Sequence, residues 1–111
     1  MLEKAIVNLV RKFLKRVEQA GIPVWAGIVY GSHARGDAHK DSDIDLLVVS
    51  SRARLKNAAR NSELLWQLRA GIDYRIEPIL VGRHRWKHDK GSPLLAIVRE
   101  EGRIILARRN N

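Results

Sequence analysis

The stretch that decides the fold runs from Gly31 to Val49 and reads GSHARGDAHKDSDIDLLVV. Its second half is a short aliphatic run rich in β-branched residues, which predicts a buried strand over residues 43–49. Side chains alternate across a strand, so Asp43 and Asp45 point to the same face, roughly 6–7 Å apart. Two carboxylates that close repel each other, and a divalent cation such as Mg²⁺ removes that cost. The aspartate pair is therefore our candidate metal site.

The first half of the stretch supplies a complementary feature. Residues 24–30 predict a strand that stops at Gly31, where a glycine allows a sharp turn and close approach of a ligand. Ser32 can cap a short helix over residues 33–35. A helix N-terminus after a tight glycine turn suits an anion, so we expect a phosphate beside the predicted metal site.

The remaining chain predicts the elements that surround this motif. Apolar residues at helical spacing indicate a helix over residues 2–20, which Gly21 and Pro23 end. A second helix is expected over about 54–70, with Ser50 or Ser51 as its cap and Trp66 in its apolar stripe. A third strand over 72–81, a helix over 93–101 behind Ser92 and Pro93, and a short strand over 104–106 follow. These elements predict an α+β domain with a mixed sheet and helices packed mainly on one face.

Gly31-Ser32 followed by Asp43-x-Asp45 at this spacing resembles the signature of the DNA polymerase beta-type nucleotidyltransferase superfamily. The fuller pattern, GSxARGxxxxxSDxDLxV, resembles the minimal nucleotidyltransferase (MNT) family. The matching residues are Gly31, Ser32, Ala34, Arg35, Gly36, Ser42, Asp43, Asp45, Leu46 and Val48. The resemblance covers nearly the whole chain and implies one minimal nucleotidyltransferase domain over residues 1–111, with the nucleotidyltransferase fold.

The resemblance also implies roles for individual residues. Asp43 and Asp45 would bridge two Mg²⁺ ions, and Gly31 and Ser32 would hold the triphosphate of an NTP. Arg35 would steady that triphosphate, or it would pair with Asp37 or Asp41.

Two-metal phosphoryl transfer generally uses a third carboxylate. The family's third carboxylate lies on the strand predicted over 72–81, where Glu77 aligns best and Asp73 is the competitor. Many relatives have Asp at this position, so Glu77 is a departure from the pattern. A structural alternative for Glu77 is an ion pair with Arg75 or a neighbouring arginine.

The activity implied is Mg²⁺-dependent transfer of a nucleoside monophosphate, AMP from ATP, to an acceptor hydroxyl. MNT members this short resemble the antitoxin of HEPN–MNT toxin–antitoxin pairs, and the implied acceptor is a tyrosine of the HEPN ribonuclease toxin. One alternative is a non-catalytic antitoxin that neutralises its partner by contact. Another is a nucleotidyltransferase acting on RNA or on a small molecule.

The net charge of +9 and the pI near 10.7 are high for a small domain. A solvated surface rich in Arg and Lys is the favoured interpretation for most of these residues, and a polyanionic partner or substrate is the alternative. Nucleic acid, an acidic protein and a nucleotide all fit, and nucleic acid is possible but not favoured because the charges are spread along the chain. The basic segment 82–91 contains His84 and His88, which we do not expect to bind metal, and Trp86, which either contacts a partner or packs inward. No run approaches the ~20 apolar residues of a membrane span, and cysteine is absent, so we expect a cytoplasmic protein without membrane contact.

Overall fold

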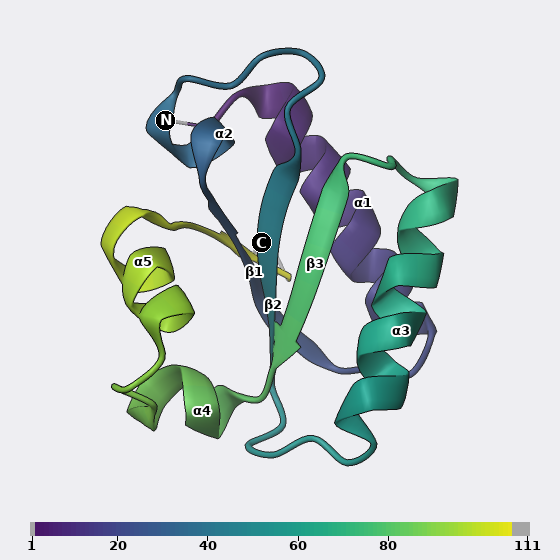
Figure 1. Cartoon of the computed structure of the whole chain (residues 1–111). Coiled ribbons are helices and arrows are strands. Elements are labelled where there is room, and N and C mark those ends of the chain that lie inside the picture. Colours follow the sequence, from purple (N-terminus) through teal and green to yellow (C-terminus); the bar gives the residue numbers. More distant parts are fainter. Residues whose placement is uncertain (1, 108–111) are drawn as a thin grey trace.

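The computed structural model describes residues 2–107. It contains a four-stranded sheet in the order β3-β2-β1-β4 (Figure 1). Strand β1 pairs antiparallel with both β2 and β4, and β2 pairs parallel with β3, so the sheet is mixed. The elements in chain order are α1 (Lys4–Gln19), β1 (Val24–Tyr30), α2 (Ser32–Arg35), β2 (Ile44–Ser50), α3 (Ala58–Leu68), the 3₁₀ turn η1 (Arg69–Gly71), β3 (Ile76–Val81), α4 (Arg83–His88), α5 (Pro93–Glu101) and β4 (Arg103–Leu106). The predicted α+β class is confirmed.

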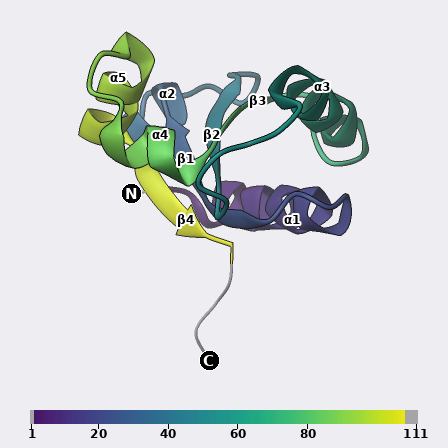
Figure 2. The same ribbon diagram turned by 90° about the horizontal axis from the view of Figure 1, so that it is seen from below.

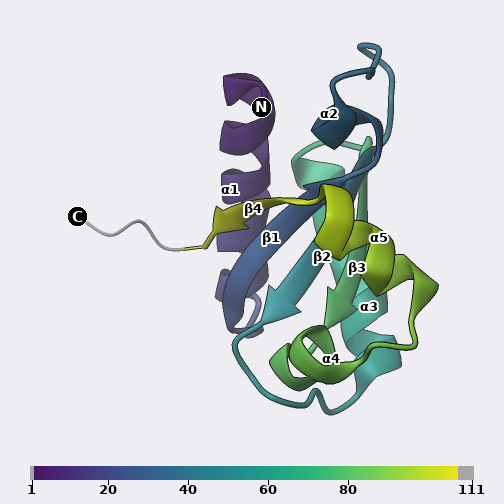
Figure 3. The same ribbon diagram turned by 90° about the vertical axis from the view of Figure 1, so that its left-hand side faces the viewer.

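The two faces of the sheet bury separate apolar clusters. The larger cluster lies under α1 and α3 and includes Phe13 and Leu65 from those helices and Leu46 from β2. The smaller one lies under α4 and α5 and includes Leu47 from β2 and Leu95 from α5. Figures 2 and 3 show α1 on one side of the sheet and α4 and α5 on the other. The longer helices thus cover one face, as expected, and two short helices cover part of the second.

The alternation of side chains along β2 explains how one strand contributes to both apolar clusters. It is buried over its whole length except at Asp45, which is half-buried. Successive side chains point to opposite faces, so Leu46 and Val48 enter the larger cluster while Leu47 and Val49 enter the smaller one. Asp45 has the same parity as Leu47. Its carboxylate therefore lies on the α4 and α5 face, at the start of the strand.

Two predicted boundaries are wrong by several residues. The strand expected from residue 72 begins at Ile76, because the carboxylate of Asp73 accepts a hydrogen bond from the backbone N–H of Arg75 and closes a turn. The helix expected from residue 54 begins at Ala58, after Asn57 in the left-handed region at φ 55°. Ser50 does not cap it, since its hydroxyl donates to the carbonyl of Pro23 at 2.6 Å. This contact joins the end of β2 to the start of β1.

Trp66 is not a core residue, contrary to its expected place in the apolar stripe of α3. It is 41% exposed, and Leu65 is the fully buried residue of that helix. The guanidinium of Arg69 lies 4.3 Å from the centre of the Trp66 ring and 5.9 Å from that of Tyr74. The sequence predicted the wrong residue for the core because Leu64, Leu65 and Trp66 are adjacent. Three consecutive apolar residues do not indicate which of them faces inward.

Candidate active site

The sheet register aligns three functional side chains in one row. Tyr30, the last residue of β1, pairs with Asp45 of β2, and Asp45 pairs with Glu77 of β3. Directly paired residues point to the same face of a sheet, so the phenol and the two carboxylates lie side by side on the α4 and α5 face. This row joins residues that are up to 47 positions apart in the chain. It is the centre of the candidate site.

Asp43 completes the carboxylate cluster from just ahead of β2. Burial of Glu77, followed by its interaction with the neighbouring Asp43, raises the pKa of Glu77. The negative charges of Asp43 and Asp45 both act on Glu77 in this direction, so the three carboxyl groups repel one another.

Asp45 is disfavoured as an anion by its surroundings. Burial and the neighbouring charge of Asp43 raise its pKa, and the cations Arg35 and His33 act in the opposite direction. Tyr30 responds to the same environment, since burial and the charges of Asp45 and Glu77 raise its pKa to about 12. The phenol consequently stays protonated at any physiological pH. The site concentrates negative charge that its protein surroundings only partly neutralise.

Gly31 makes the approach of Asp45 to the β1–α2 turn possible. Its backbone has φ 77°, in the left-handed region, and a Cβ at this position would collide with Oδ2 of Asp45. The backbone then enters α2 directly, and the N–H of Arg35 donates to the carbonyl of Gly31 at 3.0 Å. Ser32 lies at the first position of α2, and Gly31 rather than Ser32 is its N-cap. The predicted turn and short helix are both present.

The loop between α2 and β2 is tied to the same site. His33 Nε2 lies 3.3 Å from the carbonyl oxygen of Ser42, and the hydroxyl of Ser42 accepts from the backbone N–H of His39 at 2.7 Å. Arg35 pairs with Asp37 at 3.4 Å and with Glu101 of α5 at 3.1 Å. Arg35 therefore links the short helix after Gly31 to the last turn of α5. Neither Glu101 nor Tyr30 had been singled out in the sequence, because only the register and the packing of α5 bring them here.

The structure separates the two candidates for the third carboxylate. Asp73 lies in the turn before β3 and pairs with Arg75 at 3.0 Å, which lowers the pKa of Asp73. Arg75 also donates to the carbonyl of Lys40 at 2.9 Å, so this pair anchors the loop before Asp43. Glu77 forms no salt bridge with Arg75, and it faces Asp43 and Asp45. The geometry favours Glu77 as the third member of the cluster.

Hard oxygen donors and uncompensated negative charge make the carboxylate cluster chemically suited to Mg²⁺. Across residues 2–107, however, no three His, Asp or Glu side chains are gathered closely enough to ligate one ion together. The donor chemistry fits the ion, and binding one ion through three carboxylates requires at least one of them to change its position.

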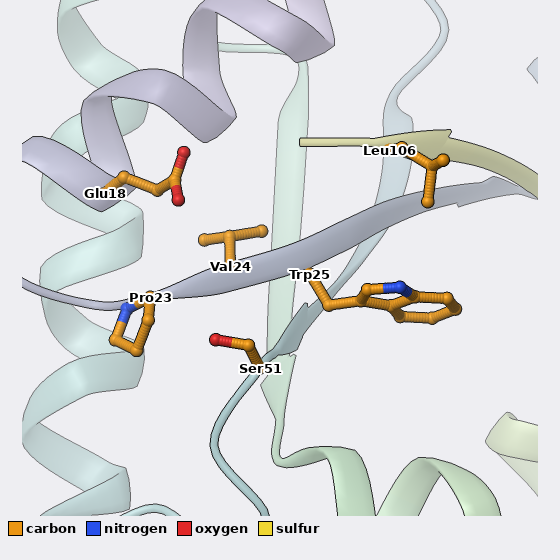
Figure 4. Close-up of a pocket in the computed structure, with 6 residues that line it drawn as sticks. All are labelled: Glu18, Pro23, Val24, Trp25, Ser51 and Leu106. Atoms are coloured by element: carbon orange, nitrogen blue, oxygen red, sulfur yellow. The ribbon is translucent and has the colours of Figure 1, made fainter. Parts of the chain in front are cut away.

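The opposite end of the sheet has a different character. A pocket of about 360 Å³ lies at the start of β1, and Figure 4 shows Trp25 and Leu106 at one end of it and Glu18 and Pro23 at the other. Trp86 of α4 packs into the smaller cluster and carries the guanidinium of Arg99 at 5.0 Å from its ring centre. Of the two alternatives for Trp86, inward packing is therefore correct. His84 and His88 have ring centres 4.6 Å apart.

Comparison with known proteins agrees with this geometry. The family described as "Nucleotidyltransferase domain" matches residues 10–106, which is most of the chain. The chain belongs to the nucleotidyltransferase family. It is 33% identical over 116 residues to "Putative protein adenylyltransferase MJ1305" of Methanocaldococcus jannaschii, and the match spans 99% of this chain and 78% of that protein.

Solved nucleotidyltransferase structures share the fold. A crystal structure of a protein from Sulfolobus solfataricus, described as a putative nucleotidyltransferase, superposes with a TM-score of 0.60 at 17% identity, over 88% of this chain and 77% of that one. A tri-AMPylated Shewanella oneidensis HEPN toxin in complex with its MNT antitoxin superposes with a TM-score of 0.54 at 18% identity, over 92% of this chain and 73% of that one. Among the described residues, no helix is long and apolar enough to cross a membrane.

Proposed function

We propose that this nucleotidyltransferase transfers AMP from ATP to a tyrosine hydroxyl of a HEPN-type toxin and acts as the antitoxin of that toxin. The observation that carries the proposal is the row Asp45–Glu77 with Asp43 in contact, directly beside the Gly31 turn. The adenylyltransferase relative and the complex of an AMPylated HEPN toxin with an MNT antitoxin support the nucleotide and the partner.

The proposed roles follow the positions of the residues. Gly31 and Ser32 hold the triphosphate at the β1–α2 turn, and Arg35 adds a positive charge from the short helix that follows Gly31. Asp43, Asp45 and Glu77 form the catalytic and metal-binding cluster. Two Mg²⁺ ions bound there would neutralise the phosphate oxygens and promote ionisation of the acceptor hydroxyl.

The reaction breaks one bond and forms another. The acceptor oxygen attacks the α-phosphorus of ATP, the bond from that phosphorus to the oxygen bridging to the β-phosphate breaks, and pyrophosphate leaves. The acceptor proton passes to Glu77, whose raised pKa makes it a better proton acceptor than an ordinary glutamate. The chain's own part is mainly to position the reactants and to organise charge.

The test is transfer of label from α-³²P-ATP, with Mg²⁺, onto a co-purified HEPN-type partner. We expect label on the partner with the wild type and none with the double variant Asp43→Ala/Asp45→Ala. Asp41→Ala is a matched control, because Asp41 is an exposed aspartate in the preceding loop and lies outside the proposed cluster. Mapping the labelled residue then tests the tyrosine assignment.

One observation favours a second function, a contact-only antitoxin. Within residues 2–107 no three His, Asp or Glu side chains are gathered closely enough to ligate one ion, and neutralisation by contact does not need them to be. If no NTP yields label while the partner is still bound and inhibited, the enzymatic proposal fails and the contact-only function stands.

A further inference from the structure

The carboxylate cluster leaves the charge of +9 unexplained, and the fold collects much of that charge elsewhere. Strand β2 ends at Ser50 and the loop that follows carries Arg52, Arg54 and Lys56, all exposed. Strand β3 ends at Val81 and leads into α4, which carries Arg83, Arg85 and Lys87. Because β2 and β3 are parallel, both basic segments emerge at the same end of the sheet (Figure 1). We call these six residues the basic face.

Backbone contacts hold the two segments together. The N–H of Arg83 donates to the carbonyl of Arg52 at 2.8 Å, and the N–H of His84 donates to the carbonyl of Ala53 at 3.0 Å. Gly82 allows this approach, because a Cβ there would lie 2.6 Å from the carbonyl oxygen of Ala53. Segments about 30 residues apart are thus joined into one surface, and the joint depends on the backbone rather than on the charges.

The cations of the basic face are largely uncompensated. Of its six cations only Arg85 forms a salt bridge with another described residue, Asp89, at 3.1 Å. The guanidinium of Arg83 lies 5.3 Å from the centre of the Trp25 ring, which fixes its position without neutralising it. Burial, followed by repulsion from Arg54 and His88, lowers the pKa of His84. Apart from the Arg85–Asp89 pair, the cations of the basic face are held close together without a salt bridge to any described residue.

Hollows lie on both sides of the loop. One, of about 230 Å³, is lined by Arg54, His84 and Arg85 over a floor that includes Leu80 and Val81. The other, of about 280 Å³, is lined by Arg52, Lys56 and Asn57 beside the turn before β1. Cations at the rim of small hollows can bind phosphate groups at several points along a chain.

This surface is separate from the candidate active site. Asp43 and Asp45 stand at the start of β2 and the basic face stands after its end, so a strand length of roughly 20 Å lies between them. A triphosphate bound at Gly31 cannot reach it. The charge therefore serves something other than the bound nucleotide.

The composition of the basic face points to a nucleic acid rather than to an acidic protein. Protein interfaces have an apolar, often aromatic, core. Within residues 2–107 the large exposed apolar residues are Trp66, Tyr74, Ile79, Ile97, Ile104 and Leu106, and none of them belongs to the two basic segments. Nucleic-acid interfaces are instead polar and strongly positive. We propose that the basic face binds the phosphodiester backbone of a nucleic acid, independently of the nucleotidyl-transfer site.

The experiment measures binding of a fluorescein-labelled single strand of about 20 nucleotides by anisotropy, at about 50 to 200 mM salt. The test variant is Arg54→Gln/Lys56→Gln/Lys87→Gln, and the matched control is Lys4→Gln/Lys12→Gln/Lys15→Gln on α1. Both variants remove the same charge from exposed positions. Circular dichroism melts confirm that both are folded.

We expect the test variant to bind at least about 10-fold more weakly at low salt, with a slope of log K against log salt that is shallower by about 2, and the control to stay within about 3-fold of the wild type. Tighter binding of RNA than of DNA would assign the ligand as RNA, and equal binding would show that only the backbone is read. Equal weakening in both variants, absence of binding by the wild type, or displacement by polyglutamate as effective as by unlabelled strand would overturn the proposal. Label transfer from ATP should be unchanged in the test variant, which keeps this result separate from the proposed enzyme activity.

Discussion

The two ends of the parallel pair β2–β3 differ in the sign of their charge and in the contacts that hold the charged side chains in place. They also differ in the kind of site that each can form. At the start of the strands, side chains from three strands meet in a row, and burial raises the pKa values of the carboxyl groups. At the far end the cations are exposed on loops and on a short helix, and backbone hydrogen bonds bring them together. Chemistry needs fixed, partly dehydrated groups, whereas recognition of a polyanion needs accessible charge. The candidate active site and the basic face therefore lie a strand length apart on one sheet.

The largest effect is expected from Asp45→Asn. Loss of this carboxylate should lower the transfer rate on the order of 10²–10³-fold, as removal of a group that organises charge in a transition state does. The same change should raise the Tm at pH 7. The folded pKa of Asp45 is raised, so the folded protein holds the proton more tightly than the unfolded chain, and stability falls as pH rises through that pKa. Asparagine removes this cost.

Asp73→Asn is the matched control at the same end of the sheet. In the wild type, Arg75 lowers the pKa of Asp73 in the folded protein. The stability that Asp73 contributes is therefore present above its pKa in the unfolded chain and is lost as pH falls. Asp73→Asn should therefore lower the Tm at pH 7 and leave transfer nearly unchanged. Thermal melts at pH 4 to 8 and the labelled-ATP assay measure both variants. If Asp45→Asn and Asp73→Asn change the Tm in the same direction, the opposite environments inferred for the two carboxylates are wrong.

The next effect is expected from Gly31→Ala, compared with Gly36→Ala. Both glycines have positive φ, 77° and 86°, so each alanine should cost about 1 kcal/mol of backbone strain. Only at Gly31 does the new Cβ meet Asp45, while Gly36 faces open space. Transfer should fall about 10-fold or more beyond any effect of Gly36→Ala. Equal activity in two folded variants would show that Asp45 does not need its present position.

Gly82→Ala tests the basic end without removing a charge. Its Cβ would press against the carbonyl of Ala53 and push the two basic segments apart, whereas Gly91→Ala adds a Cβ in nearly open space. Binding of the labelled oligonucleotide should weaken a few-fold in Gly82→Ala and stay unchanged in Gly91→Ala. Transfer of label from ATP should be unaffected in both variants. Anisotropy titrations at low salt measure this difference. Unchanged binding by Gly82→Ala would mean that the joint between the segments is dispensable.

The smallest effect is expected at Arg35. Its pairs with Asp37 and Glu101 are exposed, so Arg35→Gln should leave the Tm unchanged. If Arg35 steadies the triphosphate, Arg35→Gln raises the KM for ATP a few-fold with little change in kcat. Glu101→Gln is the control, because it breaks the ion pair and leaves the guanidinium in place. Steady-state kinetics with equal KM values for the two variants would reduce Arg35 to a structural role.

The linear pattern was enough to propose the chemistry of this protein, because most of the proposed site residues lie close together in the sequence. Gly31, Ser32, Asp43 and Asp45 fall in one stretch of 19 residues, and alternation along a single strand was enough to place two carboxylates on one face. The α1 helix and the strands β1, β2 and β4 were likewise predictable, since each follows from local periodicity or from a turn residue. The same argument failed at Asp73, where a side chain bonded to the backbone two residues on delays the start of β3.

What only the tertiary structure decided concerns residues that are distant in the chain. The choice of Glu77 over Asp73, the place of Tyr30 beside Asp45 and the link from Arg35 to Glu101 all depend on strand register and on the docking of α5. The union of the two basic segments depends on the parallel pairing of β2 and β3. Register is set by the burial of whole faces, which sums over many side chains, and so a single segment does not encode it.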